Sequence, residues 1–279
     1  MDKENSFKCT GYQLLIILGV ICLGITIPGF QVKAQPKLSN IEVFDMIKSL
    51  PTSQEIYLLL RQQKYSFNQR LNKKIDKVKP IQMNSIDATA MRLGVMSSDV
   101  LYAEMYGKRE CARNALAKMK VFMDSLQVKT ISSFKSLYKY INKSKDLDYL
   151  VFRTGSFIEQ IKDYCFERGK IKQLVLIYSG DWAESMYLML LETIKRPQIS
   201  LKHRVLEQDL IIEQLVFMYD SFEENKLIRL VKKEILGIGT IIKQTKVVGD
   251  NGELEYNKLS RRKLRKMLRA IKRIHSRMR

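Results

Sequence analysis

The sequence predicts an all-α protein, a multi-helix bundle of about eight or nine helices built from antiparallel helix pairs. Only five prolines and thirteen glycines occur in 279 residues, so few positions break a helix. Apolar residues recur three and four positions apart along most of the chain, which is the spacing of a helix face. The hydrophobic share of 46% and the charged share of 28% are typical of a globular protein.

The N-terminal residues 1–34 are predicted to be a secretory signal peptide that lies outside the fold. Two lysines precede an uncharged apolar run at 14–27, and Ala34 is a small residue before the expected cleavage site at Gln35. The alternative is an uncleaved anchor, because residues 12–30 are nearly long enough to span a bilayer. We therefore expect an exported, periplasmic protein, with membrane anchoring as the alternative.

The predicted domains after this segment are a helical bundle over 35–256 and a basic amphipathic helix over 257–279, expected to dock on the bundle. After a short lead-in, Thr52 or Ser53 can cap the first helix, with an acidic residue soon after it. The polar and basic stretch 65–80 is interpreted as a solvated loop. Helical spacing then predicts these helices in order: 86–106, 110–126, one starting at 132 or 133, 146–168, 171–194, 201–222, 225–243 and 258–278.

Two of these helices are strongly apolar, and the first of them, 86–106, is predicted to be a long buried helix at the centre of the protein. In 86–106, small residues such as Gly94 allow a neighbouring backbone to approach closely, and Asp99 is a carboxylate in mid-helix. In 171–194, the segment 179–184 interrupts the apolar pattern with small and acidic residues beside the only tryptophan. The stretch 245–256 is interpreted as a turn or small hairpin, with too few acids for a calcium loop.

The acidic residues of these two helices define one candidate site. If the two helices pack together, Asp99, Asp181, Trp182 and Glu184 would line a polar pocket that could bind a ligand. Buried carboxylates of this kind can be acid–base groups with shifted pKa values. More often they bond to backbone or tyrosine hydroxyl groups within a core, so a structural role is favoured.

The C-terminal helix carries the clearest local feature. A narrow apolar stripe is formed by Leu259, Leu264, Leu268, Ile271 and Ile274, and no acidic residue accompanies it. Such helices lie on anionic membranes or dock on a bundle and leave a charged outer face. The residues predicted to contact an anionic surface are Arg261, Arg262, Lys263, Arg265, Lys266, Arg269, Lys272 and Arg273.

Catalytic, metal and cofactor signals are weak in this sequence. His203 lies between two cations and His275 lies in the basic helix, and the sequence contains no zinc-protease, nucleophile-elbow or phosphate-loop motif. After signal cleavage only Cys111 and Cys165 remain; they could pair in an oxidising compartment, but their apolar helical settings favour separate buried thiols. We therefore predict no catalytic residue, no metal and no cofactor.

Three ordered motifs carry a resemblance to a known family. They are Leu50-Pro51-Thr52 with Glu55, then Ala90–Val95 followed by Asp99–Tyr102, then Ser179–Glu184. In this pattern the chain resembles a family of uncharacterised, exported, all-helical envelope proteins. Met96-Ser97-Ser98 and Asp181 depart from the family pattern, which has a tyrosine-containing link and a glycine there. The resemblance implies an exported helical fold and no assigned activity.

The net charge of +20 completes the functional expectation. We expect a non-enzymatic envelope binding or scaffold protein whose partner is an anionic membrane surface, a glycan or an acidic protein. Export would remove nucleic acid as the default partner of a basic protein, whereas a cytosolic location would restore it. The alternative is an enzyme or small-ligand receptor with a polar pocket near Asp99, Trp182 and Glu184.

Overall fold

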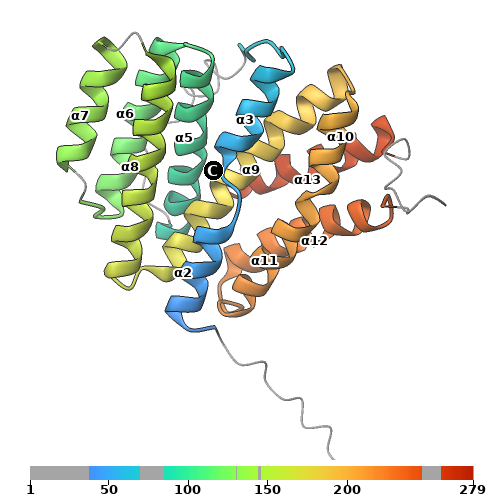
Figure 1. The fold of residues 1–279 in the computed structure, drawn as a ribbon. Helices are drawn as coiled ribbons and strands as arrows, with labels where there is room; N and C mark the ends of the chain where they lie inside the picture. Colours follow the sequence, from blue (N-terminus) through green and yellow to red (C-terminus); the bar gives the residue numbers. More distant parts are fainter. Residues whose placement is uncertain (1–37, 70–84, 130, 144–145, 247–258, 279) are drawn as a thin grey trace, which may run out of the picture. The chain divides into compact units, whose positions relative to one another are not determined.

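The structure is a computed structural model that describes residues 38–69, 85–129, 131–143, 146–246 and 259–278 (Figure 1). Within these ranges every regular element is an α-helix and none is a strand, which confirms the predicted all-α class. The helices are α2 (Asn40–Ser49), α3 (Ser53–Gln62), α5 (Ile86–Met105), α6 (Arg109–Ser125), α7 (Ile131–Lys143), α8 (Leu147–Glu167), α9 (Ile171–Lys195), α10 (Ile199–Leu206), α11 (Gln208–Asp220), α12 (Lys226–Lys243) and α13 (Arg261–Arg277).

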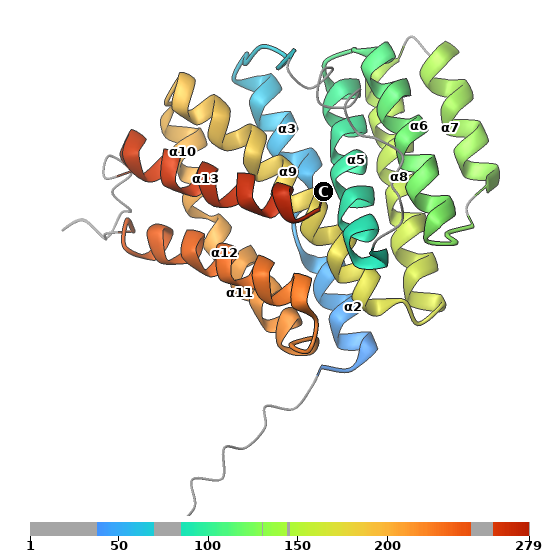
Figure 2. The same ribbon diagram turned by 180° about the vertical axis from the view of Figure 1, so that it is seen from behind.

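The two most apolar helices, α5 and α9, pack against each other at the centre of the bundle (Figures 1 and 2). Helices α6, α7 and α8 lie on the α5 side, and α10 to α13 lie on the α9 side. Helix α3 crosses both central helices and contacts each of them. Because α5 and α9 are covered on nearly every face, their residues are buried almost throughout, as the apolar sequence predicts.

Two glycines set the distance between the central helices. A Cβ atom added at Gly94 of α5 would lie 1.9 Å from the carbonyl oxygen of Ile177 on α9. A Cβ added at Gly180 of α9 would lie 1.9 Å from the carbonyl oxygen of Met91 on α5. No other residue type fits at either position without moving a backbone, so the crossing depends on this reciprocal pair of glycines.

Helix α2 is an element that the sequence analysis treated as a short lead-in. Its start is fixed by a reciprocal capping box, in which the Ser39 hydroxyl accepts from the Glu42 backbone and the Glu42 carboxylate accepts from the Ser39 backbone. Val43 and Ile47, four positions apart, bury this helix against the core. The Ser-x-x-Glu pattern was therefore an available signal for this helix.

The predicted helix 201–222 is two helices, α10 and α11, with Glu207 between them. The side-chain amide of Gln208 donates to the Arg204 carbonyl at 3.1 Å. In a continuous helix that carbonyl would accept from the backbone N–H of Gln208 itself. A side chain that occupies the backbone acceptor in this way accounts for a break without glycine or proline. Helix α9, by contrast, runs unbroken through 179–184, where the apolar pattern lapses.

Several sequence predictions fall outside the described residues. These are the signal peptide or anchor at 1–34, most of the basic loop 65–80, and nearly all of the turn at 245–256. Among the helices that the structure describes, none is long and apolar enough to cross a membrane. Cys111 and Cys165 are both buried thiols that are not joined in a disulfide, and burial raises the pKa of Cys165 to about 11.

Candidate functional site

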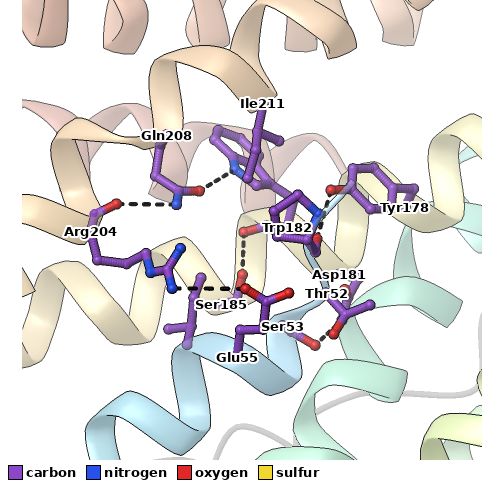
Figure 3. A pocket seen from close by; sticks show the side chains of 12 residues that line it. Thr52, Ser53, Glu55, Tyr178, Asp181, Trp182, Ser185, Arg204, Gln208 and Ile211 are labelled. Carbon is purple, nitrogen blue, oxygen red and sulfur yellow. Dashed lines mark hydrogen bonds and ion pairs between the residues drawn. The ribbon is translucent and has the colours of Figure 1, made fainter. Parts of the chain in front are cut away.

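A small recess opens where α3, α9, α10 and α11 meet (Figure 3). Two residues that precede α3, Pro51 and Thr52, complete its wall. The space that the centre of a water-sized molecule can reach measures about 10 Å³, which is roughly what a single water needs. The recess therefore does not fit a metabolite-sized ligand in this conformation.

Asp181 forms the polar floor of the recess. Its Oδ1 atom accepts a hydrogen bond of 2.6 Å from the Ser53 hydroxyl at the start of α3 (Figure 3). Burial raises the pKa of Asp181, while the Ser53 hydrogen bond and the charge of Lys162 act in the opposite direction. The carboxylate of Asp181 thus links α9 to α3 through a hydrogen bond, which is a structural role.

Trp182 is likewise held in place by the surrounding helices. Its indole Nε1 donates to the Gln208 side chain at 3.0 Å, and that side chain also caps the break between α10 and α11. At the mouth, a side-chain nitrogen of Arg204 lies 3.8 Å from a Glu55 carboxylate oxygen. Figure 3 shows this chain of contacts spanning the recess from α10 to α3.

The other two predicted site residues, Asp99 and Glu184, are fully buried and do not line the recess. Both instead act electrostatically on the hydroxyl of Tyr57. Burial raises the pKa of Tyr57 well above its usual range, and the charges of Glu184, Asp181 and Asp99 add to this effect. The Tyr57 hydroxyl bonds to Ser98 at 2.5 Å. Asp99 and Glu184 therefore belong to a packed polar core and not to an open cavity.

Glu184 also connects the core to the C-terminal helix. One of its carboxylate oxygens lies 3.2 Å from His275 Nε2 on α13, and the His275 ring meets the Tyr187 ring edge-on at 5.3 Å between centroids. The sequence alone placed His275 only within the basic helix and did not indicate this contact. The available signal was its position one residue after Ile274, at the border of the apolar stripe.

Helix α13 lies against α9 and α12 by its apolar stripe (Figure 2). The stripe is buried, and its residues are Leu264, Met267, Leu268, Ala270, Ile271 and Ile274. The opposite side, here called the basic face, is solvent-exposed and consists of Arg261, Arg262, Arg265, Lys266, Arg269, Lys272, Arg273 and Arg277. Lys263, also predicted for this surface, is only half-buried and lies at its edge.

The basic face is poor in counter-charges. Among the described residues, the only carboxylate that contacts the basic face is that of Glu234 on α12. Its Oε1 lies 2.8 Å from Nε of Arg273, and its Oε2 lies 2.7 Å from Nη2 of the same side chain. Several cations on other helices have acidic partners: Lys48 contacts Glu159 and Asp163, and Lys246 contacts Asp209. Within the described part of the chain, positive charge is thus concentrated on one helix face with a single acidic partner.

Comparisons of this chain with models of protein families, with curated proteins and with solved structures find no match. The resemblance to exported helical envelope proteins therefore stays a prediction from the sequence motifs. The functional argument rests on the two surfaces described above, of which the recess is small and internally bonded and the basic face is large and exposed.

Proposed function

We propose that this protein is a non-enzymatic binding protein that holds an anionic partner on the basic face of α13. The observation that carries the proposal is the row of exposed cations on this helix, of which only Arg273 meets a carboxylate among the described residues. Seventeen residues of helix contain nine lysines and arginines and no acid. An anionic partner would supply the missing counter-charge.

Stability alone gives no reason for such a face. Like charges four residues apart, as at Arg261, Arg265 and Arg269, destabilise a helix by about 0.2–0.5 kcal/mol for each pair. The helix is retained because its stripe is buried against α9 and α12. A sequence that keeps this repulsion on an exposed surface is best explained by a partner that relieves it.

The mode of contact follows from how α13 is packed. A free amphipathic helix binds a membrane by inserting its own apolar stripe. Here the apolar stripe of α13 is buried in the core, so only the charged side of this helix is exposed to a partner. Binding through the basic face is therefore proposed to be electrostatic and strongly weakened by salt.

The proposed setting is the cell envelope. The uncharged apolar run at 14–27 with lysines before it supports export, either with cleavage before Gln35 or with retention as an anchor. In that setting the anionic partners within reach are membrane surfaces, acidic glycans and acidic proteins. Determination of the N-terminal residue of the protein from fractionated cells tests export; an uncleaved cytosolic protein would contradict it.

The binding proposal is tested with a triple charge reversal on the basic face, Arg265→Glu, Arg269→Glu and Lys272→Glu. Each cation near an anionic surface contributes about 1 kcal/mol, so affinity should fall by at least roughly a hundredfold. The measurement is equilibrium binding of the whole chain to fluorescent heparin and to polyglutamate at about 0.05 M salt.

The chain offers a matched control on α7. Lys135, Lys139 and Lys143 are exposed and share one face of that helix, and reversing all three changes the net charge by the same amount. We expect the α7 variant to bind almost as well as the unaltered protein. Equal losses in the two variants would show that only net charge matters, and no binding to either polyanion would remove the proposal.

A further inference from the structure

We infer that the partner of the basic face is an anionic lipid bilayer, and that Phe217 and Leu236 enter its interfacial layer beside the cations. This inference rests on the proposed function and names the partner for the same surface. It is carried by a second observation, which is that exposed apolar side chains lie on the helix next to α13 and on the helix beyond it.

Helices α13, α12 and α11 lie in succession on one side of the bundle (Figure 2). The Arg273–Glu234 ion pair fixes α13 alongside α12. On α12, exposed residues recur at Lys226, Arg229, Lys233 and Leu236, with separations of three, four and three positions. This spacing describes one outward line of a helix, so α12 extends the positive surface and ends it with a leucine.

The register of α11 and α12 brings a second apolar residue to the same place. Glu213 pairs with Lys243 at 2.7 Å, and Asp220 pairs with Lys232. Between these two ion pairs, the antiparallel register sets Phe217 of α11 opposite Leu236 of α12. Phe217 is 42% exposed and Leu236 is 45% exposed, so neither is used by the core.

Leu210, seven positions before Phe217 on α11, is 65% exposed and extends the apolar surface by two helical turns. Glu213 is paired with Lys243, and Asp220 and Glu223 share Lys232, which reduces the negative charge of this region. Glu224, in the turn between α11 and α12, is exposed. The outward side of α11 to α13 thus combines exposed cations, few of which have acidic partners among the described residues, with apolar side chains.

A bilayer surface matches this combination better than a soluble polyanion does. Headgroup phosphates attract lysine and arginine, and the boundary with the acyl chains accepts phenylalanine and leucine. A sulfated glycan or a polyglutamate chain offers only the charge. Because the stripe of α13 is buried in the core, the apolar contact with lipid has to come from neighbouring helices, and Phe217 and Leu236 supply it.

The test uses the whole chain with vesicles of phosphatidylglycerol and phosphatidylcholine, or of phosphatidylcholine alone. A Phe217→Trp variant reports insertion, since the single native tryptophan, Trp182, is buried and constant. We expect a blue shift of the added emission on anionic vesicles, with quenching by brominated acyl chains. The Phe217→Ser, Leu236→Ser double variant should bind these vesicles about tenfold more weakly while keeping its heparin affinity.

Matched controls come from exposed apolar residues elsewhere. Phe152 on α8 and Leu58 on α3 are also exposed but lie away from the basic face. The emission of a Phe152→Trp variant should therefore not shift on anionic vesicles, and the Phe152→Ser, Leu58→Ser double variant should keep its vesicle affinity. Vesicle binding with an unshifted Phe217→Trp spectrum would overturn the insertion. Heparin binding without binding to anionic vesicles would overturn the bilayer inference and leave the proposed function standing. Binding to neither would overturn both.

Discussion

Among the described residues, Glu104 is a buried carboxyl group with an unusual electrostatic setting. It lies on α5 and is 2% exposed, and no ion pair with it occurs among the described residues. Burial raises the pKa of Glu104 from 4.5 to about 8, and the neighbouring Thr154 hydroxyl opposes this only in part. The folded protein therefore keeps this carboxyl protonated at pH values where the unfolded chain has lost the proton.

The sign of the pH effect follows from this difference. Between about pH 5 and pH 8 the folded state binds the extra proton, so the free energy of unfolding falls as pH rises. A Glu104→Gln variant replaces the titrating carboxyl group with a neutral amide. Between pH 5 and pH 8 it should therefore be increasingly more stable than the unaltered protein, by up to about 5 kcal/mol at pH 8. Urea unfolding at several pH values measures the difference.

A suitable comparison is Glu110→Gln on α6, where the side chain is exposed. Its stability should follow that of the unaltered protein at every pH. If the difference between Glu104→Gln and the unaltered protein were the same at pH 5 and pH 8, Glu104 would be an ordinary ionised carboxylate in the folded state.

At the scale of elements, the crossing of α5 and α9 is the most constrained contact. Gly94→Ala and Gly180→Ala each place a methyl group against a carbonyl oxygen, which only a backbone shift can relieve. Each variant should lose about 3 kcal/mol or more of stability. Gly237→Ala on α12 is the control: nothing lies within 4 Å of the added methyl. It should gain about 0.5–1 kcal/mol, because alanine is the better helix former. Thermal unfolding of the three variants decides this.

The attachment of α13 depends in part on the Glu184–His275 contact. Replacing His275 with Gln leaves the buried carboxylate of Glu184 without the imidazole, which should loosen α13 more than the rest of the bundle. Hydrogen exchange measured on α13 peptides should therefore accelerate. In a double-mutant cycle with Glu184→Gln, we expect a coupling of about 1–3 kcal/mol. Additive effects would mean that the two side chains are merely neighbours.

For the molecule as a whole, sequence patterns predicted the fold class and the position of most helices. Apolar spacing located α5 and α9, and the small residues of α5 correctly indicated a close approach. The break at Glu207 could not be predicted, because it depends on Gln208 bonding to Trp182 from a distant helix. Helix α2 was missed although its capping box is present in the sequence.

The candidate sites were less predictable than the helices. The sequence grouped Asp99, Asp181, Trp182 and Glu184 by their helices, whereas the structure places only Asp181 and Trp182 at the recess. The two acids of α9 have different partners: Asp181 accepts from Ser53 of α3, and Glu184 lies against His275 of α13. The residues of the basic face could be predicted from the sequence, because an apolar stripe on one side of a helix determines which residues lie on the opposite side.

The most direct test of the account is the salt dependence of polyanion binding. Heparin affinity of the unaltered chain, of the Arg265→Glu, Arg269→Glu, Lys272→Glu variant and of the α7 triple reversal should be measured from about 0.05 to 0.5 M salt. We predict steep slopes of log affinity against log salt for the unaltered and α7-reversed chains, and a much shallower slope for the α13-reversed chain. Equal slopes for the two reversed chains would contradict a partner held on the basic face of α13.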